Sequence, residues 1–177
     1  MLPSIELPKD FRYEPFFSEK VQCVSDLSGN SIEEVLRNNP FFYDICAKAN
    51  IDMAISPWTN SALYVPLLLK EWDAVQLKII NQFQAKARKA DKADMNHGIS
   101  ILICLLNWSN DRPVDHLDVM HSDMGSLQIK PINAAERLIY LISKPEQYHS
   151  FVQLQQLIEE TLKQFYKKNA MTNKNKL

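Results

Sequence analysis

Two long stretches of the chain place hydrophobic residues at helical spacing. In the first, the apolar residues follow at steps of 4, 3, 4 and 4: Leu68, Trp72, Val75, Ile79 and Phe83. In the second, the steps are 3, 4, 4 and 3: Phe151, Leu154, Ile158, Leu162 and Phe165. Such spacing turns one face of an α-helix toward a core. The pattern predicts two long amphipathic helices, the first opened or kinked by Pro66.

The segment of residues 95–107, with the sequence MNHGISILICLLN, is apolar nearly all round. A run of this kind is typical of a buried strand or of a buried helix. Its length and its helical neighbours favour the helix, so we expect it to be the central helix of the domain.

Polar residues at cap positions indicate where further helices begin. Ser31 is followed three residues later by Glu34, which is the spacing of a capping box. Two more pairs have this spacing: Asn133 with Glu136, and Ser150 with Gln153. The chain has only three glycines and no long alternation of polar and apolar residues. We therefore expect an all-α fold, a single compact helical domain of about six to eight helices.

The ends of the chain differ from its middle. Residues 1–30 contain three prolines and predict an extended N-terminal arm. Its aromatic side chains are expected to pack on the body: Phe11, Tyr13, Phe16 and Phe17. Residues 31–168 form the predicted helical domain, and residues 169–177 a flexible basic tail.

Composition narrows the class of protein. The 177 residues are 46% hydrophobic and 23% charged with a net charge of −1, as in a globular domain without a basic excess. Residues 1–34 carry seven acidic and three basic side chains, whereas residues 163–177 carry five lysines and no acid. Cys23, Cys46 and Cys104 have no CxxC spacing and fit reduced thiols. We expect a cytoplasmic protein with no signal peptide and no membrane span.

The stretch DHLDVMHSD, residues 115–123, concentrates carboxylates and imidazoles. We expect residues 113–124 to form an amphipathic helix, on which His116 and His121 point about 140° apart and cannot bind one ion together. Asp118 and His121 are the candidate metal ligands. A zinc site needs three or four ligands, and the others would have to come from elsewhere. We favour a solvated acidic face.

Two groups of basic residues suggest a different function, the binding of nucleic acid. The candidate nucleic-acid contacts are Lys86, Arg88, Lys89 and Lys92 at the end of the first long helix, with Lys167 and Lys168 near the end of the chain. Aspartates dilute the first group, and the lysine-rich tail lacks interleaved aromatic residues for stacking on bases.

Motifs for catalysis are missing from the sequence. It contains no HExxH, GxSxG, GxGxxG or Walker pattern, so we assign no catalytic residue and expect no cofactor. Trp58 and Trp108 lie near predicted helix ends. Each indole either covers the core or is half exposed as an anchor for a partner.

The second half of the chain resembles a known family. It contains LKEWD, LLNWSNDRPV and IKPINAAERLIYLISKPEQYHSFVQLQQLIEETLKQFY, of which KPINAAERL and PEQYHSFVQL are the most specific elements. Over residues 57–167 this pattern resembles the YpoC-like family of small bacterial proteins. The resemblance implies a bacterial, cytosolic, helical protein and brings no activity, cofactor or catalytic residue.

One residue within KPINAAERL has no evident structural partner. Arg137 follows Glu136 directly and points about 100° away from it, so the two cannot simply pair. We expect Arg137 to bind an acidic residue of the N-terminal arm, or to face a partner or an anionic ligand.

The main hypothesis is therefore a non-catalytic helical protein that acts through protein–protein contacts with an unidentified partner. Its support is the lack of motifs and the opposite charge of the two ends. The alternatives are an accessory nucleic-acid-binding factor and a metal-dependent enzyme that uses Asp118 and His121. The oligomeric state is left open.

Overall fold

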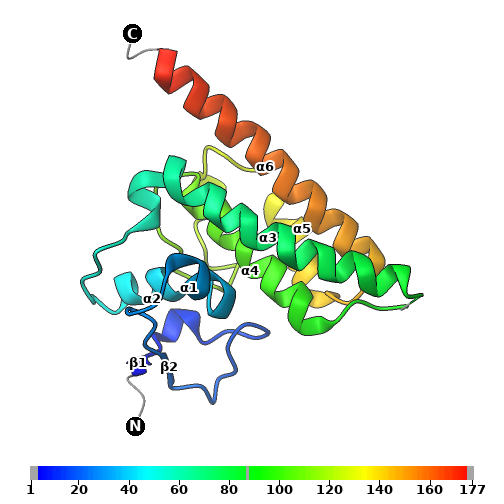
Figure 1. Ribbon diagram of the computed structural model, residues 1–177, viewed down its shortest axis with the longest axis horizontal. Helices are drawn as coiled ribbons and strands as arrows, with labels where there is room; N and C mark the ends of the chain where they lie inside the picture. Colours follow the sequence, from blue (N-terminus) through cyan, green and yellow to red (C-terminus); the bar gives the residue numbers. More distant parts are fainter. Residues whose placement is uncertain (1–3, 87, 175–177) are drawn as a thin grey trace.

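The computed structural model describes residues 4–86 and 88–174, which form six α-helices and a small sheet (Figure 1). The helices are α1 (Ile32–Asn38), α2 (Phe42–Lys48), α3 (Ser61–Gln84), α4 (Lys92–Trp108), α5 (Ala134–Ser143) and α6 (Tyr148–Lys174). The short 3-10 helices are η1 (Lys9–Phe11), η2 (Pro57–Asn60) and η3 (Met124–Ser126). Strands β1 (Ser4–Glu6) and β2 (Cys23–Ser25) pair in antiparallel fashion, with Ile5 opposite Val24. The described residues confirm the predicted number of helices. The prediction of a purely all-α fold is wrong, because β1 and β2 form a small sheet.

The central helix is α4, as its apolar sequence predicted. Nearly all of its residues from Gly98 to Trp108 are buried, and the two long helices α3 and α6 run in opposite directions beside it (Figure 1). Gly98 permits the close approach of these helices. A Cβ atom there would lie 2.8 Å from Cζ3 of Trp72 and 3.0 Å from Cδ2 of Leu154. Both predicted apolar faces contact this core, with Phe83 and Leu162 only partly buried.

The N-terminal segment, residues 4–30, folds back on itself because β1 pairs with β2. Its four aromatic side chains contact the core, as expected: Phe11, Tyr13, Phe16 and Phe17. Three of these rings surround Phe41, which precedes α2. The nearest is Phe16, edge-on to Phe41 at 5.6 Å between ring centroids. Aromatic packing therefore fixes this segment to the body.

The capping predictions have mixed outcomes. The Glu34 amide donates to Oγ of Ser31 (3.3 Å), and the Ser31 amide donates to Oε2 of Glu34 (3.1 Å), so that box is confirmed. Asn133 makes no side-chain cap, because its backbone is left-handed with φ 55°. Ser150 lies inside α6 and donates to the Lys144 carbonyl oxygen. The last two capping predictions are wrong.

The helix predicted for residues 113–124 is also wrong, because this stretch is an irregular loop that leads into η3. A helix would pair the Leu117 amide with the carbonyl oxygen of Pro113. The amide donates instead to the carbonyl oxygen of Asp10 in the N-terminal segment (3.0 Å). This tertiary hydrogen bond replaces the local one that the amphipathic pattern suggested.

The end of α6 differs from the flexible tail predicted for residues 169–177. The helix continues to Lys174, and residues 175–177 lie outside the described residues. Figure 1 shows this end of α6 projecting beyond the body. Every residue from Ala170 to Lys174 is exposed.

A buried carboxylate joins α2, α4 and the loop that follows α4. Asp44 is fully buried, and its Oδ1 accepts hydrogen bonds from Nε1 of Trp108 (3.0 Å) and from the Val114 amide (2.7 Å). The thiol of Cys104 lies 4.0 Å from Oδ2. Burial raises the pKa of Asp44 from 3.8 to about 7, although these hydrogen bonds act in the opposite direction. The fold therefore favours the protonated carboxyl group.

We expect Asp44→Asn to remove the pH dependence of stability that Asp44 creates. The folded state holds this proton more tightly than the unfolded chain, so the free energy of unfolding falls as pH rises from about 4 to about 7. Asparagine keeps the acceptor oxygen and cannot ionise. Urea unfolding at pH 5 and pH 8 should therefore show a smaller difference in free energy for the variant than for the wild-type protein.

Asp52→Asn, at an exposed carboxylate, controls for the loss of one charge. Asp44→Leu tests the hydrogen bonds, because it leaves the Trp108 indole and the Val114 amide buried without an acceptor. Each unsatisfied group costs about 1–3 kcal/mol. An identical pH dependence in the wild type and in Asp44→Asn contradicts the raised pKa.

Candidate functional site

The loop after α4 brings together the histidines that were predicted to point apart. The rings of His116 and His121 are stacked, with 5.8 Å between their centroids. Nδ1 of His121 lies 2.5 Å from Oδ2 of Asp118, and Nε2 of His116 lies 3.2 Å from Oδ1 of Asp10. The predicted separation of the histidines is wrong, because it assumed a helix.

In these contacts each imidazole pairs with a different carboxylate, so the four side chains do not converge on a single point. Within residues 4–86 and 88–174, no group of three or more His, Cys, Asp or Glu side chains is placed to hold a metal ion. Asp10 has a further partner, since Nζ of Lys48 lies 2.8 Å from its Oδ2 and lowers the pKa of that carboxyl. The Asp118–His121 pair is therefore a local contact of the loop.

The two candidate tryptophans have different surroundings. Trp108 is fully buried and donates to Asp44, so of the two alternatives its indole covers the core and is not a surface anchor. Trp58, in η2, is partly buried and lines a cavity of about 460 Å³ together with Tyr43 and Met53. A partner contact through Trp58 stays a prediction.

Arg137 connects α5 to α6. Its Nη1 and Nη2 donate to Oε2 and Oε1 of Glu160 at 3.0 Å and 3.1 Å, and its Nε donates to Oε1 of Gln153 at 3.0 Å. A bidentate pair of this kind fixes the relative position of the two helices. The prediction that Arg137 binds an acidic residue of the N-terminal arm is wrong. The guanidinium group is instead occupied by acceptors within the domain.

The predicted nucleic-acid contacts fall into two separate groups. Around the turn between α3 and α4 the exposed basic residues are Lys86, Arg88, Lys89 and Lys92; near the end of α6 they are Lys167 and the partly buried Lys168. Figure 1 shows that these two places are at opposite ends of the molecule, so they do not form one surface. Lys168 also contacts Asp111 and the Ser109 carbonyl oxygen.

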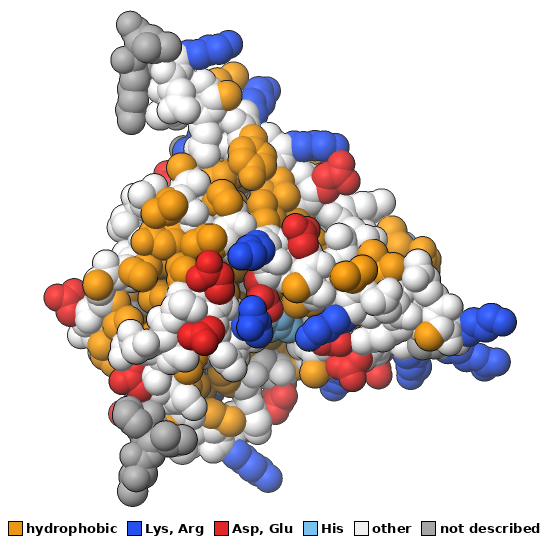
Figure 2. Space-filling model, viewed as in Figure 1, with side chains coloured by type: hydrophobic (Ala, Val, Ile, Leu, Met, Phe, Trp, Pro, Cys, Tyr) orange, Lys and Arg blue, Asp and Glu red, His pale blue; other side chains and the backbone are white. Residues whose placement is uncertain are grey.

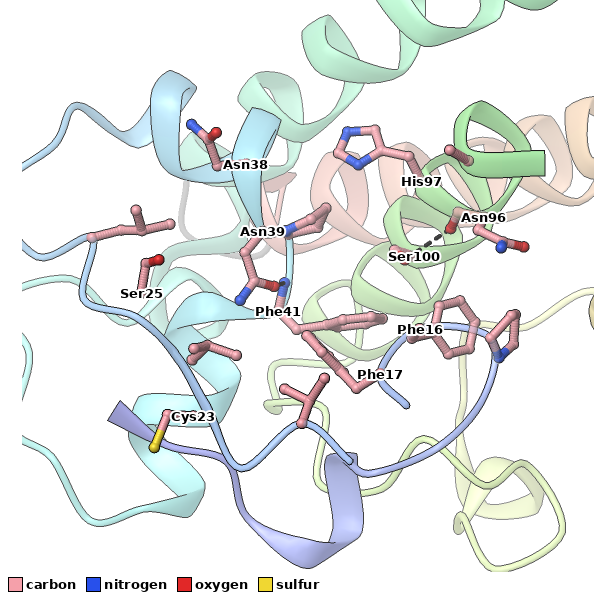
Figure 3. Close-up of a pocket in the computed structure, with 16 residues that line it drawn as sticks. Phe16, Phe17, Cys23, Ser25, Asn38, Asn39, Phe41, Asn96, His97 and Ser100 are labelled. Carbon is pink, nitrogen blue, oxygen red and sulfur yellow. Dashed lines mark hydrogen bonds between the residues drawn. The ribbon is translucent and has the colours of Figure 1, made fainter. Parts of the chain in front are cut away.

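A cavity of about 620 Å³ lies between the N-terminal segment, the α1–α2 connection and α4 (Figure 3). Phe16 and Phe17 from the N-terminal segment and Phe41 from the connection form an aromatic wall. The first turns of α4 contribute polar side chains, among them Asn96 and His97. This volume is within the usual range of small-molecule sites, about 300–1,000 Å³. We call it the α4 cavity.

His97 is oriented by a carboxylate from α3. Its Nε2 lies 3.2 Å from Oε1 of Glu71, and Oε2 of Glu71 lies 3.8 Å from Nε of Arg37. Burial lowers the pKa of His97 by more than Glu71 raises it, so the ring is neutral at pH 7. The Nε2–H group then donates to Glu71, which leaves Nδ1 as an acceptor. Figure 3 shows this nitrogen turned toward the α4 cavity.

Two amides that line the α4 cavity also keep unused hydrogen-bonding groups. Oδ1 of Asn39 accepts from the Phe41 amide (3.1 Å), and its Nδ2 makes no hydrogen bond with the described residues. Oδ1 of Asn96 is buried and has no partner in the described part of the chain. A buried polar atom without a partner is costly, so such groups favour a bound molecule or water.

The cysteines do not form a nucleophilic pair with His97. Figure 3 shows Cys23 on the far side of the α4 cavity from the imidazole. Burial raises the pKa of Cys46 to about 11 and that of Cys104 well above its ordinary value. Thiols of raised pKa are poor nucleophiles.

Comparisons with known proteins agree with the resemblance noted in the sequence. A family model described as YpoC-like protein matches residues 62–173, a range that contains Glu71 and His97. The chain is 36% identical over 155 residues to a protein of Bacillus subtilis (strain 168) named "Uncharacterized protein YpoC", an overlap that covers 88% of this chain and 93% of that protein. No solved structure matches the chain.

Among the described helices, none combines the length and the apolar character needed to cross a bilayer.

We expect His97 to be neutral at pH 7, with its proton on Nε2, because Glu71 accepts from that nitrogen. Long-range ¹H–¹⁵N correlation spectra distinguish the two tautomers. Glu71→Ala should remove the preference for the tautomer with its proton on Nε2, since it removes the carboxylate that accepts from this nitrogen. Arg37→Ala is the matched control, because it removes a neighbour of Glu71 that does not contact the imidazole. A charged ring, or a proton on Nδ1, at pH 7 in the wild-type protein contradicts the assigned geometry.

Proposed function

The chain belongs to the YpoC-like family, and we propose that it is a non-catalytic cytoplasmic protein that binds another protein at the projecting end of α6. The observation that carries the proposal is the continuation of α6 past the body, with Tyr166 50% and Met171 55% exposed. A helical segment without tertiary contacts is marginally stable in water. A partner that covers this end would stabilise it and remove its apolar side chains from water.

The start of α3 adds to the same surface. Oγ of Ser61 donates to Oδ1 of Asp111 (3.1 Å), and Asp111 contacts Lys168 on α6. Leu63, two residues along α3, is 54% exposed. Figure 2 shows hydrophobic side chains gathered over the first turns of α3 and the neighbouring part of α6. Neighbouring exposed apolar side chains are typical of an interaction surface.

Charge indicates the chemistry of the partner. Lys167 and Lys174 are exposed on the projecting end of α6, and residues 163–177 contain no acidic residue. We define the α6 face as the exposed apolar and basic side chains at this place: Leu63, Tyr166, Lys167, Met171 and Lys174. The partner that fits it presents an apolar surface with acidic residues at its edge.

We expect Leu63→Lys combined with Tyr166→Glu to weaken the partner complex by about tenfold or more, because both changes put charge into the centre of the contact. A photo-crosslinking amino acid at Met171 first identifies the neighbouring protein in cells. The affinity of the purified pair is then measured by calorimetry. Met120→Lys is the matched control, since Met120 is 76% exposed on the loop beside the N-terminal segment.

Equal affinities of the double variant and the control rule out the α6 face as the binding surface. Light scattering of the purified protein examines self-association separately. A dimer that the double variant dissociates means that a second copy of this chain covers the face, which contradicts the proposal of a different protein.

The alternative of an accessory nucleic-acid-binding factor is supported by the turn between α3 and α4. Lys89 and Lys92 line a cavity of about 260 Å³ together with Ser143 and Lys144. Figure 2 shows basic side chains grouped at this tip of the molecule. Ammonium groups around one cavity attract phosphate oxygens.

If this alternative holds, Lys89→Ala and Lys92→Ala should weaken binding of a single-stranded oligonucleotide irrespective of its sequence. Each change should reduce the slope of log affinity against log salt by about 1. Fluorescence anisotropy measures both quantities, with Lys167→Ala as the control at the other end of the molecule. Lack of binding at low salt excludes this function.

A further inference from the structure

We propose that the α4 cavity binds an uncharged nitrogen heterocycle, such as a free nucleobase, whose N–H or amino group donates a hydrogen bond to Nδ1 of His97. The proposal adds a ligand-binding site to the protein contact described above and does not depend on it. It is carried by the volume of the α4 cavity, its aromatic wall, the composition of its lining and the hydrogen-bonding groups that face it.

The shape of the α4 cavity suits a planar ring. Its volume of about 620 Å³ is ample for a single heterocycle. The rings of Phe16 and Phe41 form part of one wall and are nearly perpendicular, at 84°. A planar ligand can therefore meet the face of one ring and the edge of another, the two geometries that aromatic pairs prefer.

The lining excludes a charged ligand. None of the described residues around the α4 cavity is Asp, Glu, Lys or Arg. The ring of His97, which is neutral at pH 7, cannot neutralise a phosphate or a carboxylate. Burying an ion without a partner of opposite charge costs far more than burying a hydrogen-bonded neutral group. The ligand is therefore uncharged, and a nucleotide is a poorer fit than its base.

The polar groups select against a purely apolar ligand. His97 presents Nδ1 as an acceptor, and Nδ2 of Asn39 is a donor without a partner among the described residues. A lipid tail or a hydrocarbon would leave these groups unsatisfied. A heterocycle that carries both donors and acceptors satisfies them.

Cys23 provides a natural reporter for the test. It is the exposed cysteine of the three and lines the α4 cavity, whereas Cys46 and Cys104 are buried. A base bound to His97 should leave the alkylation of Cys23 by a maleimide unchanged, because Cys23 lies on the far side of the α4 cavity. The probes are adenine, guanine, cytosine and uracil, with AMP and inorganic phosphate as charged counterparts and 1-methylindole as a planar ring without an N–H donor.

We expect at least one nucleobase to bind saturably, to shift the ¹⁵N resonance of Nδ1 of His97 and to leave the alkylation rate of Cys23 unchanged. His97→Phe should weaken this binding by about tenfold, because it keeps a ring of similar size and removes the acceptor. His149→Phe is the matched control, since that histidine is exposed on α6 and does not line the α4 cavity. If His97→Phe does not fold, the ¹⁵N shift in the wild-type protein decides the question.

Four results overturn the proposal. The first is that none of the four nucleobases binds at millimolar concentration. The second is tighter binding of AMP or phosphate than of any base, which assigns the site to a charged ligand. The third is that 1-methylindole binds as well as the bases, and the fourth is that His97→Phe leaves base binding unchanged. Either result shows that the hydrogen bond to His97 plays no part.

Discussion

The buried carboxyl group of Asp44 is the constraint on which the surrounding structure depends. The helix that carries it, α2, has seven residues and is too short to be stable without tertiary contacts. One oxygen atom of Asp44 supplies such contacts twice, since it accepts from the end of α4 at Trp108 and from the following loop at Val114. Both donors would otherwise be buried without a partner. The same interaction thus fixes a short helix, the end of the central helix and the path of a long loop.

The position of that loop in turn determines where the N-terminal segment lies. Once Val114 is bound, the Leu117 amide reaches the Asp10 carbonyl oxygen, and the Asp10 carboxylate contacts His116 and Lys48. These contacts hold η1 against α2. The aromatic residues that follow η1 then pack around Phe41 and form the wall of the α4 cavity. The α4 cavity on one side of the molecule therefore depends on a polar interaction buried in its interior.

Local periodicity was sufficient to predict α3 and α6 with their buried faces, because each is long enough to show a repeating pattern. The α4 run is apolar nearly all round, and its length and its helical neighbours favoured a helix. It failed for residues 113–124, where an amphipathic pattern was outweighed by hydrogen bonds to residues far away in sequence. The pairing of Glu71 with His97 was missed for a similar reason. These residues are 26 positions apart on different helices, and no local signal connects them. The hydrogen-bond partner of Trp108, Asp44, was also missed, because it is 64 positions away.

The α4 cavity combines two parts of different origin in the chain. Glu71 and His97 lie on α3 and α4, inside the range that matches the family model, whereas the aromatic wall comes from residues before that range. Without the wall, Nδ1 of His97 would face water. A hydrogen bond to a ligand would then only replace a hydrogen bond to water, with little net gain in binding free energy. A ligand that fills the space between the wall and α4 would displace water, and the same hydrogen bond would then be stronger in a surrounding of lower dielectric constant. The helical core thus orients the acceptor, and the N-terminal segment encloses it.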